Sequence, residues 1–287
     1  MRIKHFGSPN SILGFGRIDL IVLIAVLGVL GAGFYVFMGR TRASDNITVC
    51  TSNLKQLGVA MAMYEKDNGG RLPYAFIRYG KASDYGPSKD VWDSLIFPLV
   101  PPGQNGLAQK HLLRCPADTL PGVQGQARRT YAMPSHSTRP ENWPLSAQNA
   151  TGVGVYWQWS FEGKVLTNFI LVTRTRTNGP TEEAITLSLP AVKLDMIHAP
   201  GSTLLLTENA WAENSAFNYH GAIIDSVKKH VSTNLDIDQY HGGKINYLMV
   251  DGHVALLYPS ESTGRADPKH DDPGKKFPNV WTIGHGN

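Results

Sequence analysis

The sequence predicts an α+β fold in which a long N-terminal helix packs against an antiparallel sheet. Three observations lead to this prediction. An apolar run without any charge covers residues 20–38, an apolar stripe with helical spacing follows it, and an Asp-Gly turn separates two apolar strands at Asp251 and Gly252. About 240 residues follow the apolar run, which is enough for one sizeable core that carries a large, loop-rich insertion.

The apolar run at residues 20–38 has the length of a membrane-spanning helix. At about 1.5 Å per helical residue it covers about 28 Å, close to the thickness of the hydrocarbon core of a bilayer. It is longer than the apolar part of an ordinary secretory signal peptide, and Arg40 and Arg42 follow it. We therefore predict a transmembrane segment at 15–40, with a signal peptide and a plain membrane anchor as the alternatives.

The predicted helix continues beyond the apolar run as an amphipathic segment. Its apolar positions recur at intervals of three and four residues, which places them on one helical face. Asp67, Asn68, Gly69 and Gly70 then provide an end signal, so we predict one helix from Phe15 to about Lys66. The residues of this stripe are Ile47, Cys50, Leu54, Leu57, Met61 and Tyr64.

The globular domain is predicted to cover 41–258 and to contain an insertion at about 74–200. Prolines are dense between residues 72 and 150, and this density predicts irregular structure. Strand-like runs occur at 154–161, 165–173, 185–189 and 202–207. The tail at 259–287 is rich in proline, glycine and charge and is predicted to be irregular, with Phe277 and Trp281 as residues that can dock.

The clearest local signal is a β-hairpin. Residues 245–250 and 253–258 are mostly apolar, and the Asp251-Gly252 pair between them is typical of a two-residue turn. Such a turn pairs residue 250 with 253 and residue 249 with 254. We expect the resulting apolar face to pack against the helical stripe, and its members are Ile245, Tyr247, Met249, Val254, Leu256 and Tyr258.

The two cysteines, Cys50 and Cys115, are predicted to form a disulfide. An exported domain meets an oxidising compartment, where an even number of cysteines favours a bridge. Two buried free thiols are the alternative. The bridge would connect the long helix to the globular part of the chain.

The segment Gly14-Phe15 followed by Asp19 and the apolar run resembles the cleavage and methylation segment of type IV prepilins and type II secretion pseudopilins. The resemblance implies that residues 1–14 are a leader, that a prepilin peptidase cuts after Gly14, and that Phe15 becomes a methylated N-terminus. Asp19 stands where the family usually has Glu. Its carboxylate can neutralise the new amine of Phe15, in the same chain or in a neighbouring subunit.

Three further motifs resemble a large bacterial family of prepilin-like proteins. They are a Cys-x-x-Asn-Leu-Lys-Gln helix from Cys50 to Gln56, a Cys-Pro-x-Asp loop from Cys115 to Asp118, and His241 followed after nine residues by Asp251-Gly252. This resemblance implies a pilin-like fold and a structural role without enzymatic activity. The implied partners are copies of the same chain, other pilin-like subunits, the prepilin peptidase and the bacterial inner membrane. The globular domain would be periplasmic or extracellular and would enter a filament on assembly.

Other groups of polar residues favour alternative functions. His241, Asp251 and His253, with Glu208 at the end of a strand, can form a metal or acid–base site, although Asp251 is also explained as a turn residue. They would support a membrane-tethered, metal-dependent hydrolase as an alternative function. A loop with Asp225, Asp236 and Asp238 is a weak candidate for structural calcium, and no other cofactor is expected.

The remaining surface signals are weak. The formal net charge of +4 is too small to predict nucleic-acid binding, and Arg128 and Arg129 are expected on a solvated face. Trp157, Trp159 and Phe161 alternate along a strand and are expected in the core. If they are exposed instead, or if the insertion captures a glycan or protein, the chain would be a membrane-anchored binding protein.

Overall fold

The structure is a computed structural model. It describes residues 17–78, 91–100, 111–136, 152–158, 172–176, 183–187, 191–209, 211, 213–218, 221–224, 240–264 and 279–281. The chain divides into two compact units, Met1–Ser44 and Asp45–Asn287. The predicted leader, Gly14 and Phe15, and the candidate calcium ligands Asp225, Asp236 and Asp238 lie outside the described residues.

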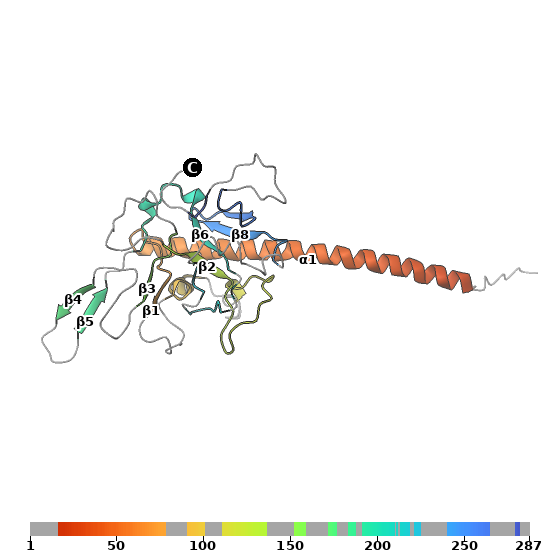
Figure 1. The fold of residues 1–287 in the computed structure, drawn as a ribbon, viewed down its shortest axis with the longest axis horizontal. Helices are drawn as coiled ribbons and strands as arrows, with labels where there is room; N and C mark the ends of the chain where they lie inside the picture. Colours follow the sequence, from red (N-terminus) through yellow and green to blue (C-terminus); the bar gives the residue numbers. More distant parts are fainter. Residues whose placement is uncertain are drawn as a thin grey trace, which may run out of the picture. The chain divides into compact units, whose positions relative to one another are not determined.

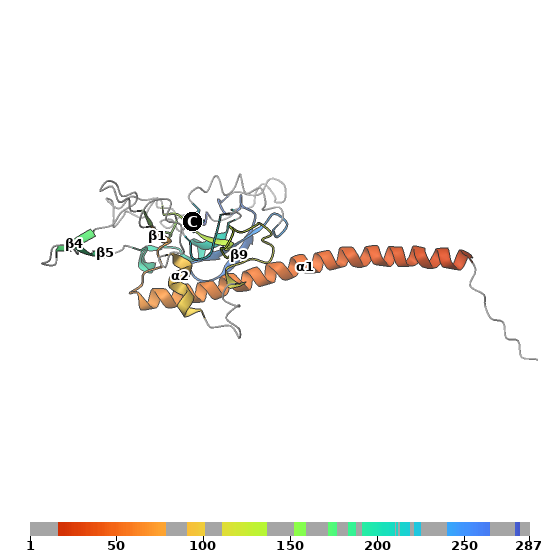
Figure 2. The same ribbon diagram turned by 90° about the horizontal axis from the view of Figure 1, so that it is seen from below.

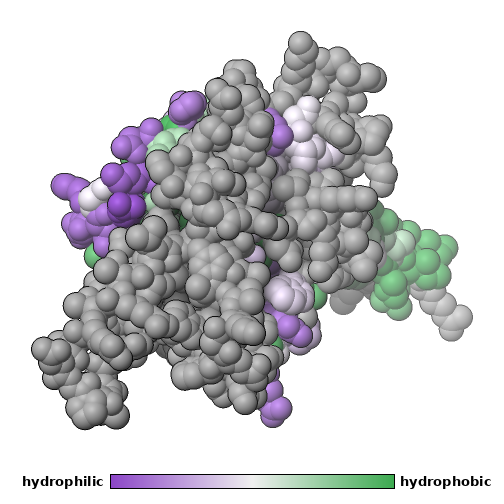
Figure 3. Space-filling view, turned by 60° about the vertical axis from the view of Figure 1, so that its left-hand side comes forward, coloured by the Kyte–Doolittle hydropathy of each residue, from purple (hydrophilic) through white to green (hydrophobic). Residues whose placement is uncertain are grey.

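The first unit contains the beginning of helix α1 (Arg17–Asp67), which has 51 residues. Large apolar side chains between Ile18 and Tyr35 are exposed, from 44% for Leu23 to 82% for Tyr35, and they form a hydrophobic surface coloured green in Figure 3. Within the part of the chain that is described, no helix has the length and apolar character needed to cross a membrane. Some side chains of the predicted span at 20–38 lie outside that part, and so does the side chain of Asp19.

In the second unit, the predicted apolar stripe of α1 is confirmed. Cys50, Leu54, Leu57 and Met61 are fully buried, and they belong to the main hydrophobic core. The helix ends as the glycines indicated, because Gly69 and Gly70 both adopt positive φ angles and the amide of Gly70 donates to the carbonyl of Glu65. Figures 1 and 2 show the central sheet beside this part of α1.

The central sheet has five strands in the order β7-β2-β6-β8-β9. They are β2 (Tyr131–Pro134), β6 (Leu204–Glu208), β7 (Ile223–Ile224), β8 (Ile245–Met249) and β9 (Val254–Leu257). All neighbours are antiparallel except β2 and β7, so the predicted antiparallel sheet is in fact mixed. Parallel pairing requires a long connection, and β2 and β7 are far apart in the sequence.

The remaining elements are short. Two small sheets pair β1 (Phe76–Arg78) with β3 (Tyr156–Gln158) in parallel and β4 (Val172–Arg176) with β5 (Glu183–Leu187) in antiparallel. Helix α2 covers Trp92–Ile96 and continues into the 3-10 helix η1 at Phe97–Leu99. Two further 3-10 helices are η4 (Leu194–Met196) and η5 (Pro200–Ser202).

The stretch predicted as an insertion contributes to the main core. Trp92, Leu113, Tyr131 and Met133 are at most 2% exposed and belong to the same cluster as Leu54. Strand β2 also lies inside the central sheet. These described residues of the 74–200 stretch are therefore part of the main core.

The hairpin forms between β8 and β9, but the predicted register is wrong by one residue. Leu248, not Met249, pairs with Val254, and Tyr247 pairs with Ala255. The amide of Gly252 donates to the carbonyl of Met249, and Gly252 has a φ of 90°. This is a longer turn that ends in a left-handed glycine, and the extra residue reverses the faces of β9 relative to β8.

This register gives the two faces of β8 different partners. The prediction that one face of β8 packs against the helix is wrong for Ile245, Tyr247 and Met249. These residues pack in a second core with Val280 and Trp281. Leu248 belongs to the main core instead, and a Cβ placed on Gly58 of α1 would lie 3.2 Å from its Cδ1 atom. Part of the tail is thus ordered on the sheet, where the amide of Leu204 donates to the carbonyl of Val280.

Candidate functional site

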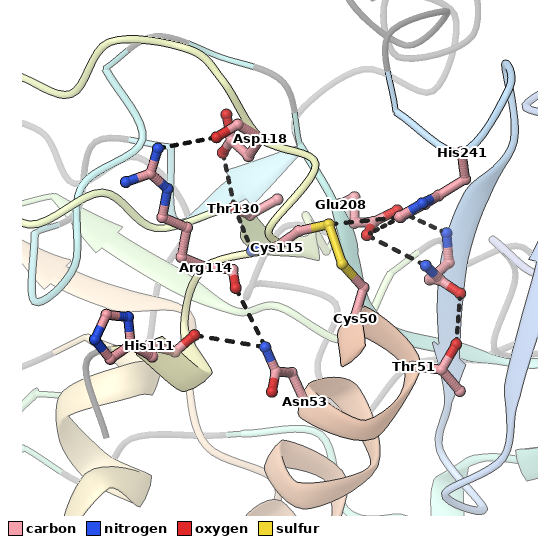
Figure 4. The surroundings of a disulfide bond; sticks show 11 residues. Cys50, Thr51, Asn53, His111, Arg114, Cys115, Asp118, Thr130, Glu208 and His241 are labelled. Carbon is pink, nitrogen blue, oxygen red and sulfur yellow. Dashed lines mark hydrogen bonds and ion pairs between the residues drawn. A yellow bond between two sulfur atoms is a disulfide. The ribbon is translucent and has the colours of Figure 1, made fainter. Parts of the chain in front are cut away.

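The sequence motifs of the globular domain meet at a disulfide. Cys50 of α1 is bonded to Cys115, and 65 positions separate the two residues in the sequence. This confirms the predicted bridge. Figure 4 shows that the disulfide lies between the helix, the loop that follows His111, the strand end that carries Glu208 and the turn that carries His241. Both cysteines are fully buried.

The Cys-x-x-Asn motif of α1 binds the loop and the sheet. The Asn53 side-chain amide donates to the carbonyl of Arg114 at 3.2 Å, directly before Cys115. Thr51 donates to the Oδ1 atom of Asn246 in β8 at 3.1 Å. The disulfide is therefore flanked by two hydrogen bonds that fix the helix to the loop on one side and to the sheet on the other.

The Cys-Pro-x-Asp loop is organised by the carboxylate of Asp118. This group accepts hydrogen bonds from the Thr130 hydroxyl at 2.7 Å, from the amide of Leu120 at 3.1 Å and from Nε of Arg128 at 2.9 Å. The Thr130 hydroxyl in turn accepts from the amide of Cys115 at 3.0 Å. Asp118 is 1% exposed, so its negative charge is compensated mainly by Arg128.

His241 is placed by a tight turn. Gly242 and Gly243 have φ angles of 67° and 86°, and His241 forms an antiparallel bridge with Lys244. Two successive positive φ angles are typical of a type I′ turn, and glycine adopts them without steric cost. The turn carries the chain into β8 and directs the imidazole into the domain, where its side chain is 1% exposed.

Glu208, the last residue of β6, is the partner of His241. Its Oε1 atom lies 3.0 Å from Nε2 of His241, and its side chain is fully buried. Its Oε2 atom accepts from the Asn246 amide at 2.9 Å, and the Asn246 side chain donates to Oε1 at 3.3 Å. The same Nε2 atom of His241 lies 3.5 Å from Sγ of Cys115.

The surroundings of this cluster are poorly solvated. Burial raises the pKa of Tyr131 well above its ordinary value, and the charge of Glu208 raises it further. Burial likewise raises the pKa of Tyr240, the residue before His241, with a smaller contribution from Asp118. Both phenols therefore stay neutral, and charges in this region interact more strongly than they would in water.

The structure separates the polar residues that the sequence grouped as one constellation. His241 pairs with Glu208, which the sequence analysis had included as a residue at the end of a strand. Asp251 instead pairs with His253 at 2.7 Å in the hairpin turn. The Asp251 and His253 side chains are 43% and 50% exposed. Asp251 also accepts from the amide of His253, so it acts in this structure as a turn residue.

The expectation that Arg128 and Arg129 lie on a solvated face is wrong. Arg128 pairs with Asp118, and Arg129 pairs with Asp93 at 3.1 Å, with both side chains of the second pair fully buried. Burial lowers the pKa of Arg129, and the neighbouring Asp93 acts against this shift. Two adjacent arginines at these positions thus fix α2 and the Asp118 loop to the core instead of facing water.

The sequence analysis did not identify Asn246 and Asp93, which make buried polar contacts in the structure. Asn246 is a polar residue in the middle of the apolar strand 245–250, and this is the one signal that it needs a buried partner. Asp93 lies beside Trp92 at the start of a short helix, where a carboxylate is unremarkable. Its Oδ2 atom accepts from the amide of Phe217 at 2.7 Å.

Chemically, the cluster combines a disulfide, an imidazole and a carboxylate without access to solvent. One ligand atom from each of Cys50, Cys115, Glu208 and His241 lies within 4.8 Å of the others.

We compared the chain with protein-family models, with curated proteins and with solved structures, and none of the three comparisons found a match.

Proposed function

We propose that this chain is a structural subunit of a pilin-like filament, of the type II secretion or type IV pilus kind, and that a prepilin peptidase processes it after Gly14. The observation that carries this proposal is the composition of α1 along its length. Between Ile18 and Tyr35 its described large apolar side chains are exposed, whereas after Asp45 its apolar stripe is buried in a globular core.

Exposed apolar side chains on all sides of a helix need an apolar environment from elsewhere. In the proposed cycle, the inner membrane provides it first, and the equivalent helices of neighbouring subunits provide it in the filament. The free amine of Phe15 and the carboxylate of Asp19 would be costly to bury separately in such an environment. Paired across two copies of the chain, they set the register of assembly.

The motifs in the globular domain support a scaffold role over a hydrolase. Cys50, Asn53 and Thr51 fix the helix to its neighbours, and Asp118 organises a loop. The side chains of Glu208 and His241 are at most 1% exposed, so a substrate has no route to them without opening the core. A head that is cross-linked in this way would stay folded when the subunit is pulled from the membrane.

Mass spectrometry of the protein from its native membranes tests the processing step. We expect an N-terminus at Phe15 that carries an N-methyl group. An N-terminus at Met1 in cells with an active prepilin peptidase, or one that follows Met38, would contradict the proposal.

The Asp19→Ala variant tests assembly. The apolar run becomes more hydrophobic, so the variant should still insert into membranes, but it should not appear in filaments viewed by electron microscopy. Asp45→Ala, which removes an exposed carboxylate from the same helix, is the matched control and should assemble normally. Filaments of Asp19→Ala at the wild-type level would exclude the proposed pairing with Phe15.

A further inference from the structure

We propose that the buried cluster of Cys50, Cys115, Glu208 and His241 binds one Zn²⁺ ion in chains whose disulfide is not formed. The four side chains come from α1, from the Cys-Pro-x-Asp loop, from the end of β6 and from the turn before β8. The proposal concerns the reduced chain alone and does not depend on filament assembly.

The geometry around His241 is that of a shared ligand centre. A single atom, Nε2, lies 3.0 Å from Oε1 of Glu208 and 3.5 Å from Sγ of Cys115. One N–H group donates well to one acceptor only, whereas a metal ion accepts all three donor atoms together. Sγ of Cys50 is held beside them by the bond to Cys115. Breaking that bond lets the two sulfur atoms move apart and leaves four ligand atoms around one point.

The donor set is suited to zinc. Zn²⁺ binds thiolate sulfur, imidazole nitrogen and carboxylate oxygen, and structural zinc sites are tetrahedral, with four protein ligands. Softer thiolates disfavour magnesium and calcium, which prefer oxygen. The two thiolates and the carboxylate carry three negative charges against two on the ion, and Asn246 donates to both oxygens of the carboxylate. All four residues are buried, so the site has no open position for water or substrate. These properties indicate a structural ion.

Neighbouring residues hold the ligands in place. Oε2 of Glu208 accepts from the Asn246 amide at 2.9 Å, which leaves Oε1 directed at His241. Asn246 is itself held by the hydroxyl of Thr51, the residue that follows Cys50. Hydrogen bonds of this kind orient metal-binding carboxylates and contribute to metal affinity.

The zinc-bound and disulfide-bonded forms are mutually exclusive. Oxidation by a second disulfide forms the Cys50–Cys115 bond and removes two electrons from the two thiolates. The external disulfide takes up these electrons with two protons and becomes two thiols, and Zn²⁺ is released. A dithiol reductant reverses the sequence. In either form the same helix and loop are cross-linked, so zinc would hold the reduced chain in its native topology until it is oxidised.

The full chain, purified in detergent and reduced with a phosphine under anaerobic conditions, provides the test. After incubation with Zn²⁺ and removal of free metal, elemental analysis should find one zinc per reduced chain and less than one tenth of that in the oxidised chain. With Co²⁺ in place of Zn²⁺, a thiolate-to-cobalt charge-transfer band should appear. His253→Ala, which changes an exposed histidine, should bind normally.

His241→Ala and Glu208→Gln should each weaken zinc binding by about tenfold or more. Glu208→Gln preserves the shape of the side chain, and circular dichroism of each variant in the oxidised form establishes that it folds. Less than one tenth of a zinc per reduced wild-type chain would overturn the proposal. Equal zinc binding by wild type and Glu208→Gln, or a cobalt spectrum without thiolate bands, would also overturn it.

Discussion

Replacing Leu54 of α1 by alanine should strongly destabilise the globular domain. Leu54 is fully buried in the main core. The substitution removes three carbon atoms, and at about 0.8 kcal/mol for each the loss of burial alone is about 2.4 kcal/mol. The cavity that remains adds to this loss, so we expect the free energy of unfolding to fall by about 2–5 kcal/mol.

Val59→Ala is the matched control in the same helix. Val59 is 62% exposed, so its replacement should change stability by no more than about 0.5 kcal/mol. Both variants can be compared with the wild type by urea unfolding of the full chain in detergent. Tryptophan fluorescence is a suitable signal, because Trp92 and Trp281 are buried in the two cores.

Comparing the stabilities of Leu54→Ala and Val59→Ala tests which face of α1 packs against the sheet. If Val59→Ala proved as damaging as Leu54→Ala, or more so, the helix would present the opposite face to the domain. The spacing of the buried stripe would then have been interpreted wrongly, together with the packing of Leu248 against Gly58.

Three further perturbations test other parts of the structure. Gly252→Val should cost about 1–3 kcal/mol in thermal unfolding, purely through its φ of 90°, because an added Cβ meets nothing within 4 Å; an unchanged midpoint would refute the observed turn. The Cys50→Ala/Cys115→Ala double variant should lose about 4 kcal/mol in chelator-treated samples, as expected for closing a loop across a separation of 65 residues, and non-reducing peptide mapping of wild type should find the linked pair. Burial lowers the pKa of His136 from 6.5, so the unfolded state binds its proton more readily and the free energy of unfolding should fall as the pH drops below about 6.5. His136→Asn should remove that part of the pH dependence, and identical pH profiles for the two proteins would contradict it.

Features that depend on local periodicity were predictable. The intervals of three and four residues located the buried face of α1 at Cys50, Leu54, Leu57 and Met61, because helical geometry alone places such residues together. The Gly69-Gly70 end of the helix is equally local, since positive φ angles favour glycine. Two cysteines allow a single intramolecular pairing, and the expected export to an oxidising compartment favoured the bridge over two free thiols.

The hairpin shows where local signals stop. Asp251-Gly252 fits both a two-residue turn and a longer turn that ends in a left-handed glycine, and the sequence offers no means to choose. The difference of one residue reverses one strand. The prediction therefore located the turn correctly but assigned Tyr247 to the helix face, whereas its partner is the second core with Trp281.

Buried charges are harder still to predict, because their partners lie far away in the sequence. Arg129 is paired with Asp93, and Glu208 is hydrogen-bonded to His241, and neither pair has a sequence pattern that links its members. Because burying an unpaired charge or polar group is costly, each of these side chains needs its partner in the core. Removing the carboxylate of Glu208 would therefore leave the Asn246 amide and the His241 ring without their acceptor, inside the region that also holds the disulfide. The same closeness that makes this cluster costly to disturb in the oxidised protein is what would let it bind a metal ion once the sulfur atoms are free.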